Sequence, residues 1–210
     1  MLDANVFQKA REALSPMKNP VKLLLFRSAS HESGEMMEQL IRELSNANPL
    51  LSIGVLDFDS QSPEAAQYGV KNPSTLCIIG KEKRSIRMLG MPSGMEFMPF
   101  LKTIVDVSRG EADLARGLQD TIMSIDFEVN LKVFVTPSCP HCPGVARLAH
   151  IMALLNPKVS SEVIESMEFP GLSQHYKVGG VPKMVINEAK EVVGGYPPEV
   201  ILKRILDSRP

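Results

Sequence analysis

The sequence has little of what marks a membrane, secreted or nucleic-acid-binding protein. Its formal net charge is −1, so no long-range field draws it toward nucleic acid or anionic lipid. No apolar run approaches the roughly 18 residues of a membrane span, and the N-terminus MLDANVFQKAREAL lacks the apolar centre of a signal peptide. Three cysteines are too few for a secreted disulfide framework. We therefore expect a cytoplasmic protein that binds neither nucleic acid nor membranes.

The chain does contain enough apolar residues for a substantial core. Of its 210 residues, 44% are hydrophobic and 22% are charged, which suits one large domain or two small ones. Apolar periodicity predicts the same order of elements twice, namely helix, strand, helix, strand, helix, strand, strand, helix. The predicted strands are 21–26, 50–58, 74–79, 85–89, 131–135, 158–164, 183–186 and 191–194. The predicted helices are 2–14, 34–44, 63–68, 94–107, 114–125, 145–152, 169–176 and 198–206.

The two halves also resemble each other in local sequence. YGVKNPSTLCII in the first half matches YKVGGVPKMVI in the second, and LGMPSGMEF matches GGYPPEV. Self-similarity at a fixed spacing is the signature of an internal repeat. We therefore predict a duplication, with one unit at 1–110 and the other at 111–210.

The segment VFVTPSCPHC places two cysteines where a predicted strand gives way to a helix. A cysteine just before a helix meets unpaired N–H groups and the positive end of the helix dipole, which favour the thiolate. We predict that Cys139 is the nucleophile and that Cys142, three positions later and behind it, is the resolving thiol. Pro140 would occupy the first helical position, and His141 would add a donor or a positive charge. The plain alternative is a pair of buried cysteines without chemistry.

A zinc site is the other use of two nearby cysteines, and the sequence argues against it. Structural zinc needs four ligands, whereas only Cys139 and Cys142 are local, with His150 two turns further along the predicted helix. Cys77 stands alone inside a predicted strand, so we interpret it as a small buried hydrophobe. We expect no metal.

TPSCPHC, followed some forty residues later by GGVPKMV, resembles a thioredoxin-family active site and its facing cis-proline loop. The doubled unit with one cysteine pair is similar to the N-terminal domain of the flavoprotein subunit of alkyl hydroperoxide reductase, and more distantly to the protein disulfide oxidoreductases and the glutaredoxin-like family. The resemblance implies an α/β protein of two tandem thioredoxin-like folds, each a central mixed β-sheet flanked by helices. In the first unit Ala29 and Glu32 stand at the cysteine positions of ASHE, so that unit cannot exchange disulfides. Glu32 and His31 are interpreted as surface residues.

The same resemblance assigns further site residues. It implies a cis bond between Val181 and Pro182, beside which the backbone would pair with an extended substrate segment; the alternative is a trans proline that begins an edge strand. It also implies that Glu96, in SGMEF, reaches across from the first unit and moves a proton at the cysteine pair. The alternative for Glu96 is a solvated carboxylate in the first turn of a helix.

The function implied is that of a thiol–disulfide oxidoreductase that relays reducing equivalents through Cys139 and Cys142. No GxGxxG fingerprint is present, so we expect no bound cofactor beside the redox-active disulfide. Electrons would come from a separate thioredoxin-reductase-like flavoprotein and pass to a peroxiredoxin or another protein disulfide. Two alternatives stay open. One is a general protein disulfide oxidase or isomerase. The other is a non-catalytic binding module that holds glutathione at Gly194 and Gly195, as in glutaredoxins, or an iron–sulfur cluster bridged between two chains with glutathione. The two glycines otherwise form a tight turn before the last helix.

Overall fold

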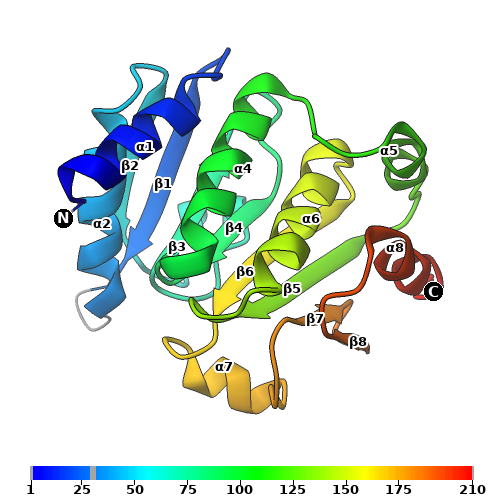
Figure 1. The fold of residues 1–210 in the computed structure, drawn as a ribbon. Coiled ribbons are helices and arrows are strands. Elements are labelled where there is room, and N and C mark those ends of the chain that lie inside the picture. Colours follow the sequence, from blue (N-terminus) through cyan, green and yellow to red (C-terminus); the bar gives the residue numbers. More distant parts are fainter. Residues whose placement is uncertain (1, 29–31, 210) are drawn as a thin grey trace.

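The computed structural model describes residues 2–28 and 32–209, and these form an eight-stranded mixed sheet with helices on both faces (Figure 1). The strands follow the order β2-β1-β3-β4-β6-β5-β7-β8, so each half places its second strand outside its first and then adds its third and fourth. The strands are β1 (Val21–Arg27), β2 (Leu51–Asp57), β3 (Thr75–Ile79), β4 (Ile86–Leu89), β5 (Val129–Val135), β6 (Val159–Glu165), β7 (Lys183–Ile186) and β8 (Lys190–Val193).

The helices repeat in the same way in both halves. They are α1 (Ala4–Leu14), α2 (Glu32–Ser45), α3 (Pro63–Tyr68), α4 (Phe97–Arg109), α5 (Arg116–Met123), α6 (Cys142–Leu155), α7 (Pro170–His175) and α8 (Pro198–Leu206), with a 3₁₀ turn η1 (Gly94–Glu96) before α4. Local sequence explains several ends. The side chains of Asp3 and Ser62 accept backbone N–H bonds at the starts of α1 and α3, and Gly110 ends α4 in the left-handed conformation. No helix in the described part of the chain is long and apolar enough to cross a bilayer.

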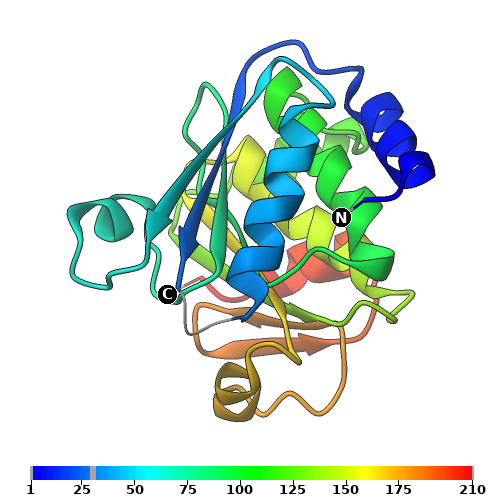
Figure 2. The same cartoon turned by 90° about the vertical axis from the view of Figure 1, so that its left-hand side faces the viewer.

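The continuous apolar run of β1 follows from burial of both faces of the sheet. Leu23 and Leu25 join the large core under α1, α2, α4, α6 and α8, whereas Leu24 and Phe26 join a smaller cluster with Ala65 of α3. Figure 2 shows α3 on the opposite side of the sheet from α2 and α4. Alternate residues of one strand therefore serve two cores.

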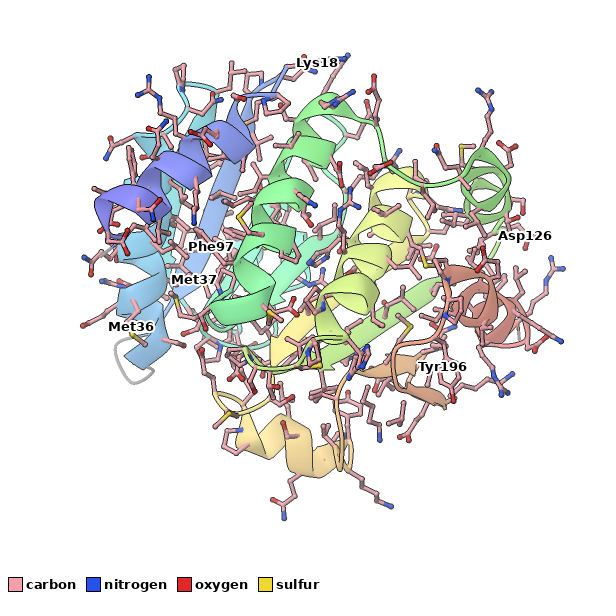
Figure 3. All side chains as sticks on the ribbon, viewed as in Figure 1. Lys18, Met36, Met37, Phe97, Asp126 and Tyr196 are labelled. Atoms are coloured by element: carbon pink, nitrogen blue, oxygen red, sulfur yellow. A yellow bond between two sulfur atoms is a disulfide. The ribbon has the colours of Figure 1, made fainter. Side chains whose placement is uncertain are left out.

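Side chains of α2 show how a helix divides between core and solvent. Met37 is fully buried and Phe97 packs against the same core, whereas Met36 is 47% exposed. Figure 3 shows Met37 and Phe97 between α2 and α4, with Met36 at the outer side of α2. Ala29 and His31, which the sequence places at the degenerate first site, lie outside the described residues, as does the side chain of Glu32.

The prediction of two tandem thioredoxin-like folds is confirmed, but their sheets are fused. β4 pairs in parallel with β6, with Ile86 opposite Ser161 and Leu89 opposite Ile164. A buried ion pair crosses this junction, since Arg87 Nε donates to Glu162 Oε1 at 3.0 Å. The junction lies between strands of different halves, so the sheet continues from one to the other.

Strand direction decides which ends of the sheet share an edge. β1 and β2 are parallel, β3 runs against both β1 and β4, and β4, β5 and β6 are parallel to one another. The carboxyl ends of β1, β2, β4, β5 and β6 therefore lie along one edge of the sheet, here called the carboxyl rim. The loops that follow β4, β5 and β6 meet there.

Candidate active site

Cys139 and Cys142 lie on the carboxyl rim, where β5 ends and α6 begins. They form a disulfide, with their Cα atoms 5.5 Å apart. The backbone N–H of Cys142, at the start of α6, donates to Cys139 Sγ at 3.1 Å. An N–H donor at the positive end of a helix dipole stabilises a thiolate at that sulfur once the disulfide opens.

The two cysteines differ in access to solvent. Cys139 is 8% exposed, whereas Cys142 is fully buried. The prediction that Cys142 is the less exposed of the two is confirmed. A cysteine that meets a partner protein must be accessible, whereas the cysteine that closes the disulfide needs to reach only its neighbour.

The predicted place of Pro140 is wrong. Helical hydrogen bonding begins at Cys142, so Pro143 and not Pro140 lies in the first turn of α6. The reason is that Pro143 has no backbone N–H, so it cannot donate the bond to Cys139 O that a helix starting at Pro140 would need. Pro140 is exposed, ahead of α6.

His141 caps the start of α6 by position but makes no side-chain cap bond there. Its side chain is exposed and packs against Gly195, where an added Cβ would lie 2.9 Å from His141 Cβ. Gly194, with φ of +111°, donates its N–H to Pro182 O at 2.8 Å. The two glycines therefore form a turn that packs against His141, next to Cys142. Tyr196 follows this turn and is 51% exposed (Figure 3).

The Val181–Pro182 bond is cis, as predicted. Pro182 is buried and Val181 half-buried, and β7, which follows them, pairs with β5 through Lys183 opposite Phe134. This pairing places the cis-proline loop at the carboxyl rim, where β5 leads to Cys139.

Lys183 holds the cis-proline loop in place, a role that the sequence analysis did not predict. Its ammonium group is almost fully buried, donates to the backbone oxygen of Tyr176 at the end of α7 and pairs with Glu191 at 2.8 Å. It thereby ties α7 to the first residue after the cis proline. The signal was a lysine at the head of an otherwise apolar strand, KMVI, since a buried lysine needs partners.

Glu96 is buried and does not face solvent as the alternative interpretation required. Only 4% of the residue is exposed, and burial raises the pKa of its carboxyl to about 7. The N–H of Met95 donates to Pro137 O at 2.8 Å, and a Cβ at Gly94 would lie 2.5 Å from that same oxygen. The turn that carries Glu96 thus packs against the residues that lead to Cys139.

Cys77 and His150 take no part in this arrangement. Burial raises the pKa of the Cys77 thiol to about 12, which leaves it protonated and unreactive. His150 is buried, lies 2.9 Å from Ser161 Oγ through Nδ1, and has its pKa lowered by burial to about 3. Among the described residues, no three His, Cys, Asp or Glu side chains are grouped so that they could hold a metal ion.

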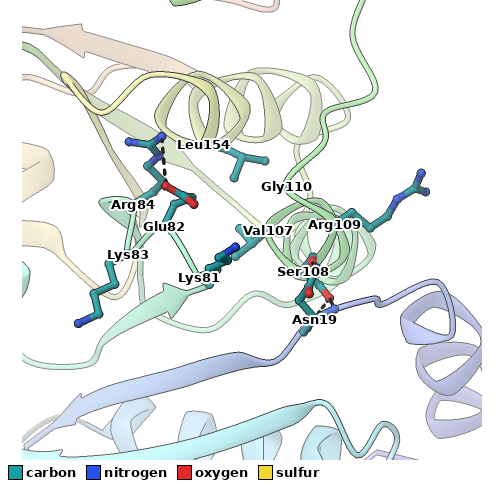
Figure 4. A pocket seen from close by; sticks show the side chains of 11 residues that line it. Asn19, Lys81, Glu82, Lys83, Arg84, Val107, Ser108, Arg109, Gly110 and Leu154 are labelled. Carbon is teal, nitrogen blue, oxygen red and sulfur yellow. Dashed lines mark hydrogen bonds and ion pairs between the residues drawn. The ribbon is translucent and has the colours of Figure 1, made fainter.

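A cavity of about 280 Å³ lies at the other end of the sheet, between the β3–β4 turn and the end of α4. Figure 4 shows the Lys81 side chain directed toward Val107 and Ser108, whereas Lys83 and Arg109 extend away. Because β4 starts at this end and β5 ends at the carboxyl rim, the cavity is remote from the cysteines. A disulfide between Cys139 and Cys142, at a strand-to-helix junction beside a cis proline, defines a thiol–disulfide oxidoreductase with a thioredoxin fold.

Comparison with known proteins agrees with this class. A family model described as "Thioredoxin domain" matches residues 129–207. A stretch of 79 residues, 37% of this chain, is 34% identical to the thioredoxin of Methanocaldococcus jannaschii and covers 93% of that protein. The chain belongs to the thioredoxin family.

Longer relatives match both halves. The chain is 25% identical over 187 residues, 89% of its length, to the alkyl hydroperoxide reductase AhpF of Escherichia coli, but spans about a third (34%) of that relative. The NTD_N/C domain of alkylhydroperoxide reductase AhpF from Enterococcus faecalis has the same fold, with a TM-score of 0.89, 21% identity, and 98% of this chain and 100% of that chain covered. A protein disulfide oxidoreductase from Aeropyrum pernix matches with a TM-score of 0.87, 29% identity, and 98% and 93% covered.

Proposed function

We propose that the chain relays reducing equivalents between protein dithiols and protein disulfides through Cys139 and Cys142. The observation that carries this proposal is a disulfide at the start of α6 between one slightly exposed and one fully buried cysteine. The cis Val181–Pro182 bond and the buried Glu96 carboxyl lie on loops of the same rim. This arrangement suits thiolate attack, resolution and proton transfer.

In the reducing direction, the Cys139 thiolate attacks one sulfur of a partner disulfide. A Cys139–partner S–S bond forms, the partner's own S–S bond breaks, and the partner's first thiolate takes up a proton. Cys142 then loses its proton and attacks Cys139 Sγ, which forms the Cys139–Cys142 disulfide and releases the partner's second thiolate. Two electrons and the single proton of Cys142 thus pass to the partner, and the second partner thiolate takes its proton from water.

Glu96 is the proposed proton donor and acceptor in these steps. A general acid or base acts best when its pKa lies near the working pH, and the pKa of Glu96 is about 7. Its Oε1 atom is buried without a hydrogen-bond partner, so it can hold or give a proton without breaking another bond. His141, exposed at the start of α6, would add a donor near the thiolate.

Substrate binding is proposed for the cis-proline loop and the cysteine turn. The backbone at Val181 would pair with an extended segment of the partner, as in strand addition. Pro140 and Pro182 would supply apolar contacts on either side of the disulfide. Binding of this kind recognises the extended backbone beside the partner's disulfide, and it depends less on the partner's amino-acid sequence.

The proposed electron donor is a thioredoxin-reductase-like flavoprotein, and the proposed acceptor is a peroxiredoxin or another protein disulfide. The similarity to alkyl hydroperoxide reductase AhpF over 89% of the chain supports this choice. We also propose two thioredoxin-like domains, 1–110 and 111–210, with the boundary in the connector between Gly110 and α5. A reducing compartment such as the cytoplasm suits this chemistry.

The proposal is tested by trapping. Cys142→Ser should accumulate a mixed disulfide with an oxidised peroxiredoxin, because attack can occur but resolution cannot. Cys139→Ser is the matched control and should trap nothing. Electrophoresis without reductant measures how much mixed disulfide each variant forms. Equal trapping by the two variants, or turnover by Cys139→Ser, would contradict the proposed roles.

A second function, general protein disulfide oxidation or isomerisation, is favoured by the 29% identity to the Aeropyrum pernix oxidoreductase over 98% of this chain. Reduction potential separates the two. A relay that reduces partners should lie near thioredoxin, about −270 mV, whereas an oxidase or isomerase should lie near −180 mV or above, on the order of −120 mV. Equilibration with defined glutathione ratios gives the value.

A further inference from the structure

The loop from Gly90 to Glu96, here called the crossing loop, belongs to the first half but contacts the second half at two points. At one end, the N–H of Met95 donates to Pro137 O at 2.8 Å. At the other, the N–H of Met91 donates to Glu168 Oε1 at 2.9 Å. The crossing loop therefore spans from Glu168 to the turn that holds Cys139, and it carries Glu96 at its end.

Glu168 is itself fixed from within the second half. It follows β6, and its own N–H donates to Glu165 Oε2 at 2.6 Å. Glu165 is the last residue of β6 and is only 3% exposed. The backbone of Glu168 is thus held at the end of β6, the strand that pairs with β4, from which the crossing loop departs.

Gly90 shows how closely the crossing loop lies on these side chains. Its φ is +83°, and a Cβ there would lie 2.8 Å from Glu168 Oε2 and 2.9 Å from Glu165 Cβ. Only glycine adopts this conformation at this separation without a clash. The backbone of the crossing loop is therefore held between Glu168 at its start and Pro137 at its end.

This contact places one oxygen of each carboxylate, Glu165 and the half-buried Glu168, out of reach of solvent, which has a desolvation cost. Glu168 Oε2 and Glu165 Oε1 are buried without hydrogen-bond partners, and burial raises the pKa of the Glu165 carboxyl. An apolar side chain would pack here without that cost. An apolar side chain would not, however, accept the Met91 N–H.

We propose that Glu168 is a positioning residue, which holds the Met91 N–H and so sets where Glu96 lies beside the Cys139–Cys142 pair. The inference rests on the proposed function, because it assigns Glu168 an effect exerted through Glu96. Glu168 makes no contact with the reacting sulfurs. It gives the first half, which has no cysteine pair, a fixed place for its carboxyl at the second half's site.

The test compares three variants in single-turnover exchange between the reduced protein and a small alkyl disulfide, whose leaving thiolate takes up a proton near neutral pH and which needs no protein partner. Glu168→Ala removes the acceptor and should slow exchange as much as Glu96→Gln does, by about 10²-fold for a lost proton donor. Glu168→Gln keeps an oxygen that accepts the Met91 N–H and should stay within about twofold of wild type. Glu128→Ala removes an exposed carboxylate at the far end of β5 and should match wild type.

A double variant decides whether Glu168 acts through Glu96. If it does, Glu96→Gln with Glu168→Ala should exchange no more slowly than Glu96→Gln alone. The proposal would be overturned if Glu168→Ala slowed the Glu96→Gln protein by the same factor by which it slows the wild-type protein. It would also be overturned if Glu168→Ala exchanged at the wild-type rate while Glu96→Gln was slow. If Glu168→Ala does not fold, Glu168→Asp, which withdraws the oxygen by one methylene, takes its place. The proposed function itself would fail separately, through exchange that persists in Cys139→Ser.

Discussion

At the scale of single residues, three groups decide the chemistry. Cys139 Sγ accepts the N–H of Cys142, the Cys142 thiol is fully buried, and the Glu96 carboxyl is buried on the neighbouring turn. The surroundings of Cys139 and of Glu96 favour opposite protonation states near neutral pH. The donor at Cys139 favours the thiolate, and burial of Glu96 favours the acid.

The first prediction concerns the Cys139 thiolate. In the reduced protein, Cys139 should react with iodoacetamide well below the pH of roughly 8.5 at which a free cysteine is half ionised. Cys142→Ser should keep this low-pH reactivity and Cys139→Ser should lose it, as alkylation rates followed from pH 5 to 9 would show. The reverse pattern would exchange the roles of the two cysteines.

The second prediction concerns the Glu96 carboxyl. Burial raises its pKa from 4.5 to about 7, so between these values the folded protein binds a proton that the unfolded chain releases. Its contribution to stability is therefore fully present below pH 4.5 and is lost as pH rises through 7.

The melting temperature of wild type should accordingly fall from pH 5 to pH 8 relative to that of Glu96→Gln, which carries no such proton. Glu165, whose pKa is also raised by burial, is present in both proteins and cancels in the comparison. Parallel curves for the two proteins would show that Glu96 is not held as a neutral acid.

At the scale of elements, the loop between β8 and α8 supports the cysteine turn by direct packing. Gly195→Ala would place a methyl group 2.9 Å from His141 Cβ. We expect a loss of about 1–3 kcal/mol in the free energy of unfolding and slower exchange, since the cysteine turn must shift. Gly171→Ala, on α7 with nothing within 4 Å of the added Cβ, is the matched control and should exchange at the wild-type rate. Denaturant unfolding measures the first effect.

The sequence predicted individual elements well where turn residues mark their ends. The periodicity of 183–186 and 198–206 matched β7 and α8 to the residue, because Pro182 directly precedes the strand, Asn187 begins a turn after it, and Pro198 opens the helix. The prediction failed at Pro140, because apolar periodicity takes no account of the backbone N–H that Pro143 lacks and that a helix starting at Pro140 would need. Glu168 was missed for a related reason, since its contact exists only where β4 meets β6.

At the scale of the whole molecule, the pairing of β4 with β6 joins the halves. Such pairing between strands far apart in sequence has no local signal, so the two folds were predictable but their fusion was not. Arg87 and Glu162 form a buried ion pair across it at 3.0 Å, and Arg147 pairs with Asp106 between α6 and α4 at 2.8 Å. We expect the halves to unfold together.

The corresponding prediction uses Arg87→Met, which leaves Glu162 buried without its partner. We expect a loss of about 3–5 kcal/mol in the free energy of unfolding. Adding Glu162→Gln should restore part of it. Calorimetry should show one cooperative transition for wild type, with equal calorimetric and van't Hoff enthalpies. Two separated transitions would mean that the junction is too weak to couple the halves.

The difference in exposure between the two cysteines also bears on the order in which the proposed partners would bind. Cys139 is 8% exposed and Cys142 is fully buried, so a donor and an acceptor would compete for Cys139 under the proposed function. No ternary complex should then form, because each partner must leave before the other binds. Steady-state turnover should then follow a ping-pong scheme, in which double-reciprocal plots at several acceptor concentrations are parallel and excess of either partner inhibits by occupying the wrong form.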